Sequence, residues 1–100
     1  MNLHYTLAAH AHISRIYDYI EMQNPLAASR VVARIRSAAE RLTENPEMGR
    51  IGAAVDTREW VVRGLPYIIV YEVQAERGQV VVLGIYHGAQ QRPGQVDDER

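Results

Sequence analysis

Residues 57–73 read TREWVVRGLPYIIVYEV, and this stretch decides the fold. In its first part, Thr57–Val62, charged and apolar side chains alternate, which is typical of a strand with two different faces. Gly64-Leu65-Pro66 then provides a turn. Tyr67–Val73 is almost continuously apolar, as expected of a central strand that is covered on much of both faces. The stretch therefore predicts two neighbouring strands joined by a short turn.

The chain after this pair predicts one more strand and a polar tail. Residues Gln74–Gly78 carry a hairpin turn, and Gln79–His87 is the last strand of a three-stranded meander. From Gln90 the composition becomes polar and acidic, so residues 94–100 are expected to form a flexible acidic tail. Residues 1–93 then form one domain, because a chain of 100 residues builds a single core.

The first half of the chain predicts a strand and two helices. Leu3–Leu7 alternates with a period of two, which indicates a short strand. From Ala8 to Met22 apolar side chains recur every three or four residues, as in an amphipathic helix. Asn24-Pro25 provides the N-cap and first residue of a second helix. That helix ends at Asn45-Pro46, because the residue before proline avoids the α region, and Gly49–Gly52 is predicted to be a turn.

This order of elements defines an α+β fold. It consists of an N-terminal strand, an antiparallel two-helix hairpin and a three-stranded antiparallel meander, with all strands in one sheet. Each helix has one apolar stripe, so the two helices cover one face of a four-stranded sheet. The second face is predicted to be open for a partner or a substrate. Trp60 is expected to be a core residue under the helices or, as the alternative, an exposed aromatic anchor for a partner.

The composition excludes several classes of protein. Without cysteine the chain has no disulfide, no thiolate nucleophile and no cysteine-ligated zinc. The spacing of the four histidines does not suit a metal site, and no metal or cofactor is expected. No apolar run approaches the roughly 20 residues that a membrane span needs, and the N-terminus does not resemble an export signal. A cytoplasmic protein without a membrane segment is therefore expected.

The charge does not indicate nucleic acid as the main ligand, because the net charge is -1 with histidine neutral. All 11 basic residues are arginine. A GC-rich genome explains this sufficiently. Arginine is also the residue that pairs best with carboxylate and phosphate groups, which is the alternative explanation.

Several fragments occur in an order and spacing that are more specific than any one of them. They are Asp18-Tyr19-Ile20 before Asn24-Pro25, Ala27-Ala28, the stretch Leu42–Gly52 with Pro46, Gly49, Arg50 and Gly52, then Thr57-Arg58-Glu59, Pro66–Tyr71 and Tyr86-His87-Gly88-Ala89. With these fragments the sequence resembles the RelE/ParE superfamily of type II toxins. The resemblance covers residues 3 to about 93 and implies the fold described above.

The resemblance implies the toxin component of a type II toxin–antitoxin system, which arrests growth when free and is neutralised by a cognate antitoxin. Antitoxins of this superfamily typically place a helix and an extended segment around the toxin. Two targets are implied as alternatives. ParE-like toxins inhibit DNA gyrase, whereas RelE-like toxins are ribosome-dependent mRNA endoribonucleases. The first is a binding inhibitor and the second is an enzyme.

The ribonucleases of the superfamily carry a base, an acid and phosphate-holding cations on the open face of the sheet. In many of them the third strand reads Tyr-Arg-Leu-Val-Tyr, and its arginine holds the scissile phosphate. Here Ile68 stands in place of that arginine. Some of them end the last strand with a His-Tyr pair, whereas this chain has His87-Gly88 and no lysine anywhere. We therefore expect ParE-like inhibition of gyrase, with mRNA cleavage and an inactive relative as the alternatives.

The candidate site residues are Arg50, Arg58, Arg63 and His87. All four are candidates for target binding, and Arg58, Arg63 and His87 are candidates for catalysis if the chain is a ribonuclease. Each has a structural alternative. His87 can hydrogen-bond the backbone, and Arg50 can be a solvated loop side chain. Arg58 and Arg63 have opposite strand parity, so at least one is expected to be a surface arginine or to pair with Glu59 or Glu72.

Overall fold

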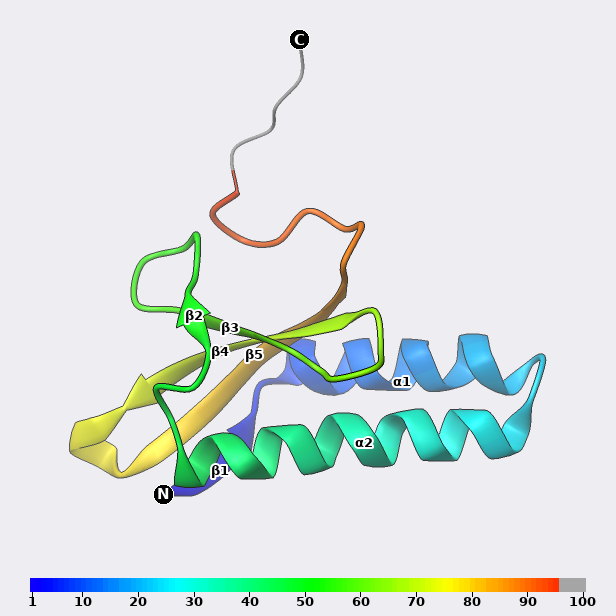
Figure 1. Ribbon diagram of the computed structural model, residues 1–100, viewed down its shortest axis with the longest axis horizontal. Helices are drawn as coiled ribbons and strands as arrows, with labels where there is room; N and C mark the ends of the chain where they lie inside the picture. Colours follow the sequence, from blue (N-terminus) through cyan, green and yellow to red (C-terminus); the bar gives the residue numbers. More distant parts are fainter. Residues whose placement is uncertain (96–100) are drawn as a thin grey trace, which may run out of the picture.

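The computed structural model describes residues 1–95, and its elements follow the predicted order (Figure 1). The first strand, β1 (Asn2–Tyr5), precedes the two helices α1 (Leu7–Glu21) and α2 (Pro25–Glu44). The remaining elements are the strands β2 (Arg50–Ile51), β3 (Arg58–Val61) and β4 (Tyr67–Gln74), the 3-10 turn η1 (Ala75–Arg77), and the strand β5 (Gln79–His87). The α+β class is confirmed. Most of the expected acidic tail, residues 96–100, lies outside the described residues.

The sheet has five strands in the order β1-β5-β4-β3-β2. The antiparallel meander of β3, β4 and β5 is confirmed, and β1 lies parallel to β5. The prediction of four strands and of a turn at Gly49–Gly52 is wrong, because Arg50 and Ile51 pair with Glu59 and Arg58. A strand of two residues has no periodic pattern, so its pairing with β3 alone identifies it.

Local signals define the helix ends. The hydroxyl of Thr6 accepts a hydrogen bond from the Ala9 N–H and caps α1. Asn24 caps α2 in the same way, and Pro25 occupies its first position, as predicted. Within residues 1–95 neither helix is long and apolar enough to cross a membrane.

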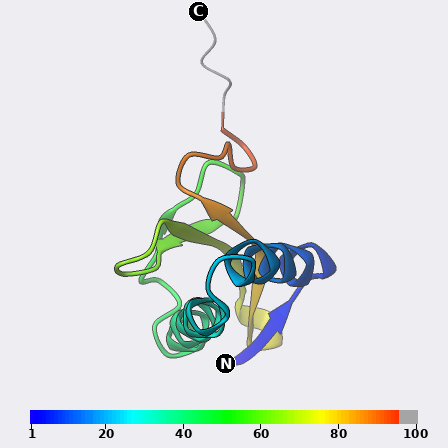
Figure 2. The same cartoon turned by 90° about the vertical axis from the view of Figure 1, so that its right-hand side faces the viewer.

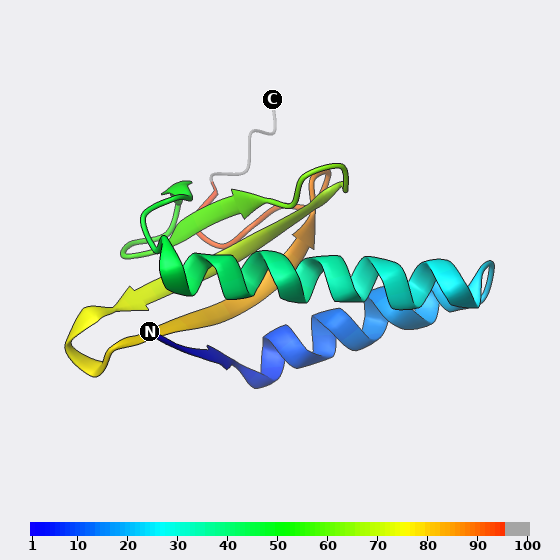
Figure 3. The same cartoon turned by 60° about the horizontal axis from the view of Figure 1, so that its bottom comes forward.

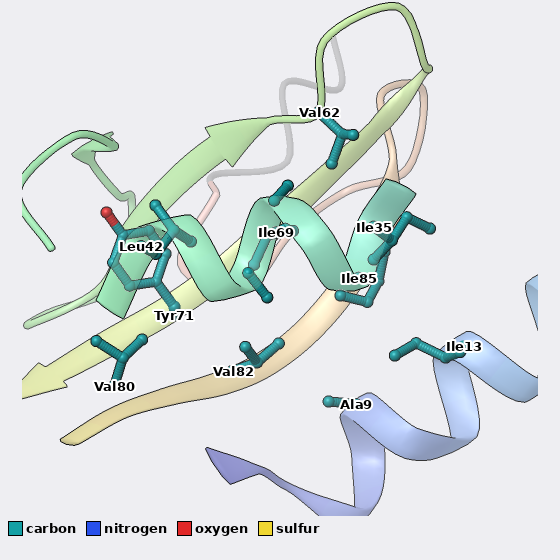
Figure 4. Close-up of a cluster of buried hydrophobic side chains, with 12 residues drawn as sticks. Ala9, Ile13, Ile35, Leu42, Val62, Ile69, Tyr71, Val80, Val82 and Ile85 are labelled. Carbon is teal, nitrogen blue, oxygen red and sulfur yellow. The ribbon is translucent and has the colours of Figure 1, made fainter. Parts of the chain in front are cut away.

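The hydrophobic core lies between the helix hairpin and one face of the sheet (Figure 4). Ile35 and Leu42 of α2 point toward the strands, and Tyr71 of β4 is fully buried beneath them. Val80 and Val82 of β5 complete the same cluster. Trp60 is half-buried and packs against it, so the core interpretation of this residue is correct.

The phenol of Tyr71 holds the loop between α2 and β2. Its oxygen donates a hydrogen bond to the Pro46 carbonyl at 2.7 Å and accepts one from the Gly49 N–H at 2.9 Å. A Cβ at Gly49 would lie 2.6 Å from this oxygen, so the position requires glycine for close approach. The glycine that the sequence analysis assigned to a turn therefore serves packing.

The sheet face opposite the helices is partly covered by the chain itself. Residues 88–95, here called the C-terminal strap, run from the end of β5 toward the loop after β2 (Figure 2), and Figure 3 shows them behind the strands. The strap packs closely against the loop after β2, because a Cβ at Gly94 would lie 2.4 Å from the Ala54 nitrogen. Ile68 and Val70 alternate with the helix-facing residues of β4 and are nevertheless buried. The prediction of an open second face is therefore wrong over β3 and β4.

Replacing Tyr71 by phenylalanine should destabilise the fold without changing its shape. The Tyr71→Phe variant leaves the Gly49 N–H and the Pro46 carbonyl without their partner, which costs about 1–3 kcal/mol. Urea denaturation measures the loss in the free energy of unfolding. Tyr86→Phe is the matched control, because its hydroxyl makes no hydrogen bond within the described residues. Equal stability of the two variants would contradict the role of the Tyr71 phenol.

Candidate functional site

The four candidate residues lie at two separate ends of the sheet. Arg50 and Arg58 lie where β2 and β3 begin, whereas Arg63 lies in the turn between β3 and β4. His87 ends β5 and pairs with Tyr67, which begins β4 beyond that turn. Arg58 begins β3, whereas Arg63 lies in the turn that follows the other end of this strand. The structure therefore does not bring the predicted residues together in one site.

Arg58 holds the loop that precedes β2. Its Nη1 donates hydrogen bonds to the carbonyl oxygens of Gly49 at 2.7 Å and Glu47 at 3.4 Å. Burial raises the pKa of the Tyr71 phenol, and the Gly49 hydrogen bond and the Arg58 charge offset this only in part. The phenol thus stays protonated and keeps donating to Pro46. Within residues 1–95, Arg58 forms no ion pair with Glu59 or Glu72.

Glu59 places a buried carboxylate on the face opposite the helices. It is 4% exposed, and its Oε1 lies 3.0 Å from both the Arg50 Nη2 and the Arg92 Nε. Its Oε2 accepts a hydrogen bond from the Ala53 N–H at 3.4 Å. Burial alone would raise the pKa of this carboxyl, but the hydrogen bonds from Arg50, Ala53 and Arg92 and the charge of Arg92 outweigh burial and lower it. Both arginines therefore neutralise a carboxylate of the chain itself.

Arg92 was not among the predicted site residues. It lies in the polar stretch after β5, where the sequence has no periodicity that would place it. The structure buries most of its side chain beside Glu59, where the strap meets β3. This ion pair is what fixes the C-terminal strap to β3.

Arg63 and His87 are both exposed at the other end of the sheet. The Arg63 carbonyl accepts a hydrogen bond from Arg34, while its own guanidinium makes no hydrogen bond or ion pair in the described part of the chain. The Nδ1 of His87 accepts a hydrogen bond from the Ala89 N–H at 3.1 Å, and the ring lies edge-on to Tyr67. The neutral imidazole therefore carries its proton on Nε2.

A groove of about 500 Å³ lies beside His87, between α1 and the ends of β4 and β5. His12 contributes to it from α1, and its Nδ1 accepts a hydrogen bond from the Ile85 N–H at 3.1 Å. β1 pairs with β5 only as far as Val82, so the Ile85 N–H has no strand partner on that side, and His12 accepts its hydrogen bond instead. The full lining is His12, Arg15, Ile16, Tyr19, Tyr67, Ile85, His87 and Gln90.

This groove has no signature in the sequence. Its residues come from α1 and from strands about 50 to 75 positions later, and nothing local connects them. No group of three or more residues suited to metal binding occurs within residues 1–95.

Solved structures of toxin–antitoxin systems have the same fold. The chromosomal ParDE system of P. aeruginosa aligns with a TM-score of 0.77 at 23% identity, over 87% of this chain and 95% of that one. The intact E. coli RelBE complex aligns with a TM-score of 0.68 at 17% identity, over 90% and 98% of the two chains. This chain thus has the fold of these toxins.

The sequence comparisons define the family more narrowly. A family model described as "ParE toxin of type II toxin-antitoxin system, parDE" matches residues 3–92, so the chain belongs to this family of toxins. It is 42% identical to "Putative toxin Y4kP" of Sinorhizobium fredii, over 91% of this chain and 92% of the relative. It is also 42% identical to "Toxin RelE2" of Caulobacter vibrioides, over 85% and 92%. The family model thus carries the ParE name, whereas one of the two relatives carries the RelE name.

The Glu59 ion pairs should make stability depend on pH. The Glu59→Gln variant should lose about 1.5–3 kcal/mol of unfolding free energy at neutral pH, because hydrogen bonds to a charged group contribute this much. The pKa of Glu59 is lowered on folding. Its contribution is therefore complete above the pKa of about 4.3 of an unfolded glutamate and is lost as the pH falls through the folded value. The difference between variant and wild type should shrink below about pH 4.

Urea denaturation at a series of pH values between about 7 and 3 measures this difference. Glu76→Gln is the matched control, because Glu76 is exposed in η1 and forms no ion pair in the described chain. The control should follow the wild type at every pH. A deficit in Glu59→Gln that stays constant down to acid pH would show that charge is not the source of the effect.

Proposed function

We propose that the free chain arrests growth by binding DNA gyrase and that a cognate antitoxin keeps it inactive. Membership of the ParE toxin family supports both parts of this proposal. The related solved structures are ParDE and RelBE systems, which supports an antitoxin as the partner. The choice of gyrase rests on the side chains of the sheet face opposite the helices.

That face lacks the cations that hold RNA in the ribonucleases of the superfamily. Ile68, which stands where their phosphate-holding arginine is expected, is buried rather than exposed to a ligand. Arg50 and Arg92 are engaged by Glu59, and the strap that carries Arg92 lies over the face. RNA binding needs cations that are free to neutralise phosphates. An inhibitor that acts by binding a protein has no such requirement.

His87 also lacks the surroundings of a catalytic acid or base. Its Nδ1 is engaged by a backbone N–H, and no carboxylate orients the ring within residues 1–95. General acid–base catalysis needs a group whose proton is directed at the reacting atom. As an exposed donor at the same end of the sheet as Arg63, His87 suits recognition of a protein surface.

Cleavage of mRNA on the ribosome is the second candidate function. The relative named "Toxin RelE2", at 42% identity, is the observation that favours it. Gyrase supercoiling and the integrity of translated mRNA should be measured in parallel with the purified wild type. The proposal expects inhibited supercoiling and intact transcripts. Specific cuts in translated messages, with unaffected supercoiling, would replace it by the ribonuclease function.

Expression of the chain alone should stop growth, and co-expression of the small gene beside its own should restore it. The physical reason is that the antitoxin covers the surfaces that meet the target. Colony counts after induction measure toxicity, and co-purification measures direct contact. Normal growth with abundant, folded product would contradict the toxic function.

His87→Ala should remain toxic, whereas Arg63→Ala should lose more activity. Loss of a general acid or base would lower the activity about 10²–10⁴-fold, whereas loss of one contact should weaken gyrase inhibition only a few-fold, by about 1 kcal/mol. Dose–response curves for supercoiling inhibition measure both variants. Arg63 is suited to this comparison because its guanidinium has no partner within the described chain. Complete inactivity of His87→Ala alone would favour catalysis.

Arg58→Ala should also lower activity, but it cannot be interpreted in the same way. The change removes the hydrogen bonds to Gly49 and Glu47, so it loosens the loop before β2 as well as removing a charge. Its melting temperature must therefore be compared with that of Arg63→Ala, which should equal the wild type.

A further inference from the structure

The helix hairpin projects beyond the sheet, and this overhang forms the groove beside His87. Figures 1 and 3 show α1 and α2 extending past the ends of β4 and β5. Along α1 the buried residues are Ala9 and Ile13, both in its first half. The second half therefore has its sheet-facing side only partly covered, and the groove of about 500 Å³ lies there.

The groove has an apolar floor that continues onto the tip of the hairpin. Ile16 and Tyr19 of α1 line it, together with Tyr67 and Ile85 of the sheet. Tyr19 is 67% exposed, and Met22, three residues further along, is 86% exposed. Side chains three residues apart share one helix face, so these two extend the apolar surface in one direction.

The polar groups of the groove are hydrogen-bond donors. The Nδ1 atoms of His12 and His87 both accept backbone hydrogen bonds, so each neutral ring offers an N–H at Nε2. Burial and the charge of Arg15 lower the pKa of His12, which keeps this tautomer at neutral pH. Burial, with a smaller effect of Tyr19, raises the pKa of Tyr67, so its phenol stays protonated.

Arg15 adds a full positive charge to this set. Its guanidinium has no ion pair or hydrogen bond within residues 1–95, and no carboxylate lines the groove. The groove thus joins a free cation and several donors to an apolar floor. The complementary ligand carries an acceptor with negative charge beside an apolar side chain.

We propose that this groove docks a segment of the target protein in which an acidic side chain lies beside an apolar one. The carboxylate meets Arg15 and an imidazole N–H, and the apolar side chain packs against Ile16 and Tyr67. This inference rests on the proposed function, because it assumes a protein target rather than RNA.

The size of the groove favours the target over the antitoxin as its occupant. A stable interface buries about 1,600 Å² in total, and a groove of this volume accepts a few side chains. Such a groove suits one anchoring contact within a larger surface. An antitoxin that surrounds the toxin has many other contacts and should tolerate changes here.

The test uses charge reversal in the groove and at a distant control position. Arg15→Glu places a like charge opposite the proposed carboxylate, so the concentration needed to inhibit gyrase supercoiling should rise at least about ten-fold. Arg77→Glu is the matched control, because Arg77 is exposed in η1 at the opposite end of β5. The control should inhibit like the wild type. Both variants should keep their melting temperature and co-purify with the antitoxin.

A second variant, Tyr19→Ala, removes the exposed part of the apolar floor and should weaken inhibition without loss of charge. Inhibition by Arg15→Glu that equals the wild type would overturn the proposed docking site. Joint loss of gyrase inhibition and antitoxin binding would also overturn it, because the groove would then belong to the antitoxin interface. A wild type that leaves supercoiling unaffected would instead refute the proposed function, and that result precedes any comparison of variants.

Discussion

The structure of the sheet face opposite the helices depends on the burial of the Glu59 carboxylate. A carboxylate excluded from water is stable only when it is paired and hydrogen-bonded. Arg50 from β2 and Arg92 from the C-terminal strap provide the pairing. One side chain of β3 thus holds the edge strand on one side and draws the chain end across the sheet on the other.

The position of the strap across the sheet determines which surfaces remain exposed to a partner. The helices cover one face of the sheet, and the strap covers the other over β3 and β4, so Ile68 and Val70 are buried although they face away from the helices. Where β5 ends, Arg63 in the turn and His87 in the lining of the groove are both exposed. Recognition at this end of the sheet requires neither the open face nor a catalytic proton.

The fold itself does not choose between the two activities of the superfamily. ParDE and RelBE structures align with this chain at similar coverage. Activity depends on which side chains the shared scaffold presents. Here Ile68 is buried, and Arg50 and Arg92 are paired with the Glu59 carboxylate.

The sequence by itself determined the elements whose signals are local. Proline and asparagine caps defined both ends of α2, and the apolar run of β4 and the span of β5 were predicted closely. The tertiary structure alone decided the pairing of β2, the path of the strap and the meeting of His12 with β5. The Arg92–Glu59 pair joins residues 33 positions apart, and the His12–Ile85 bond joins residues 73 apart. Such contacts depend on how the chain packs in space, and periodicity and capping report only on neighbours along it.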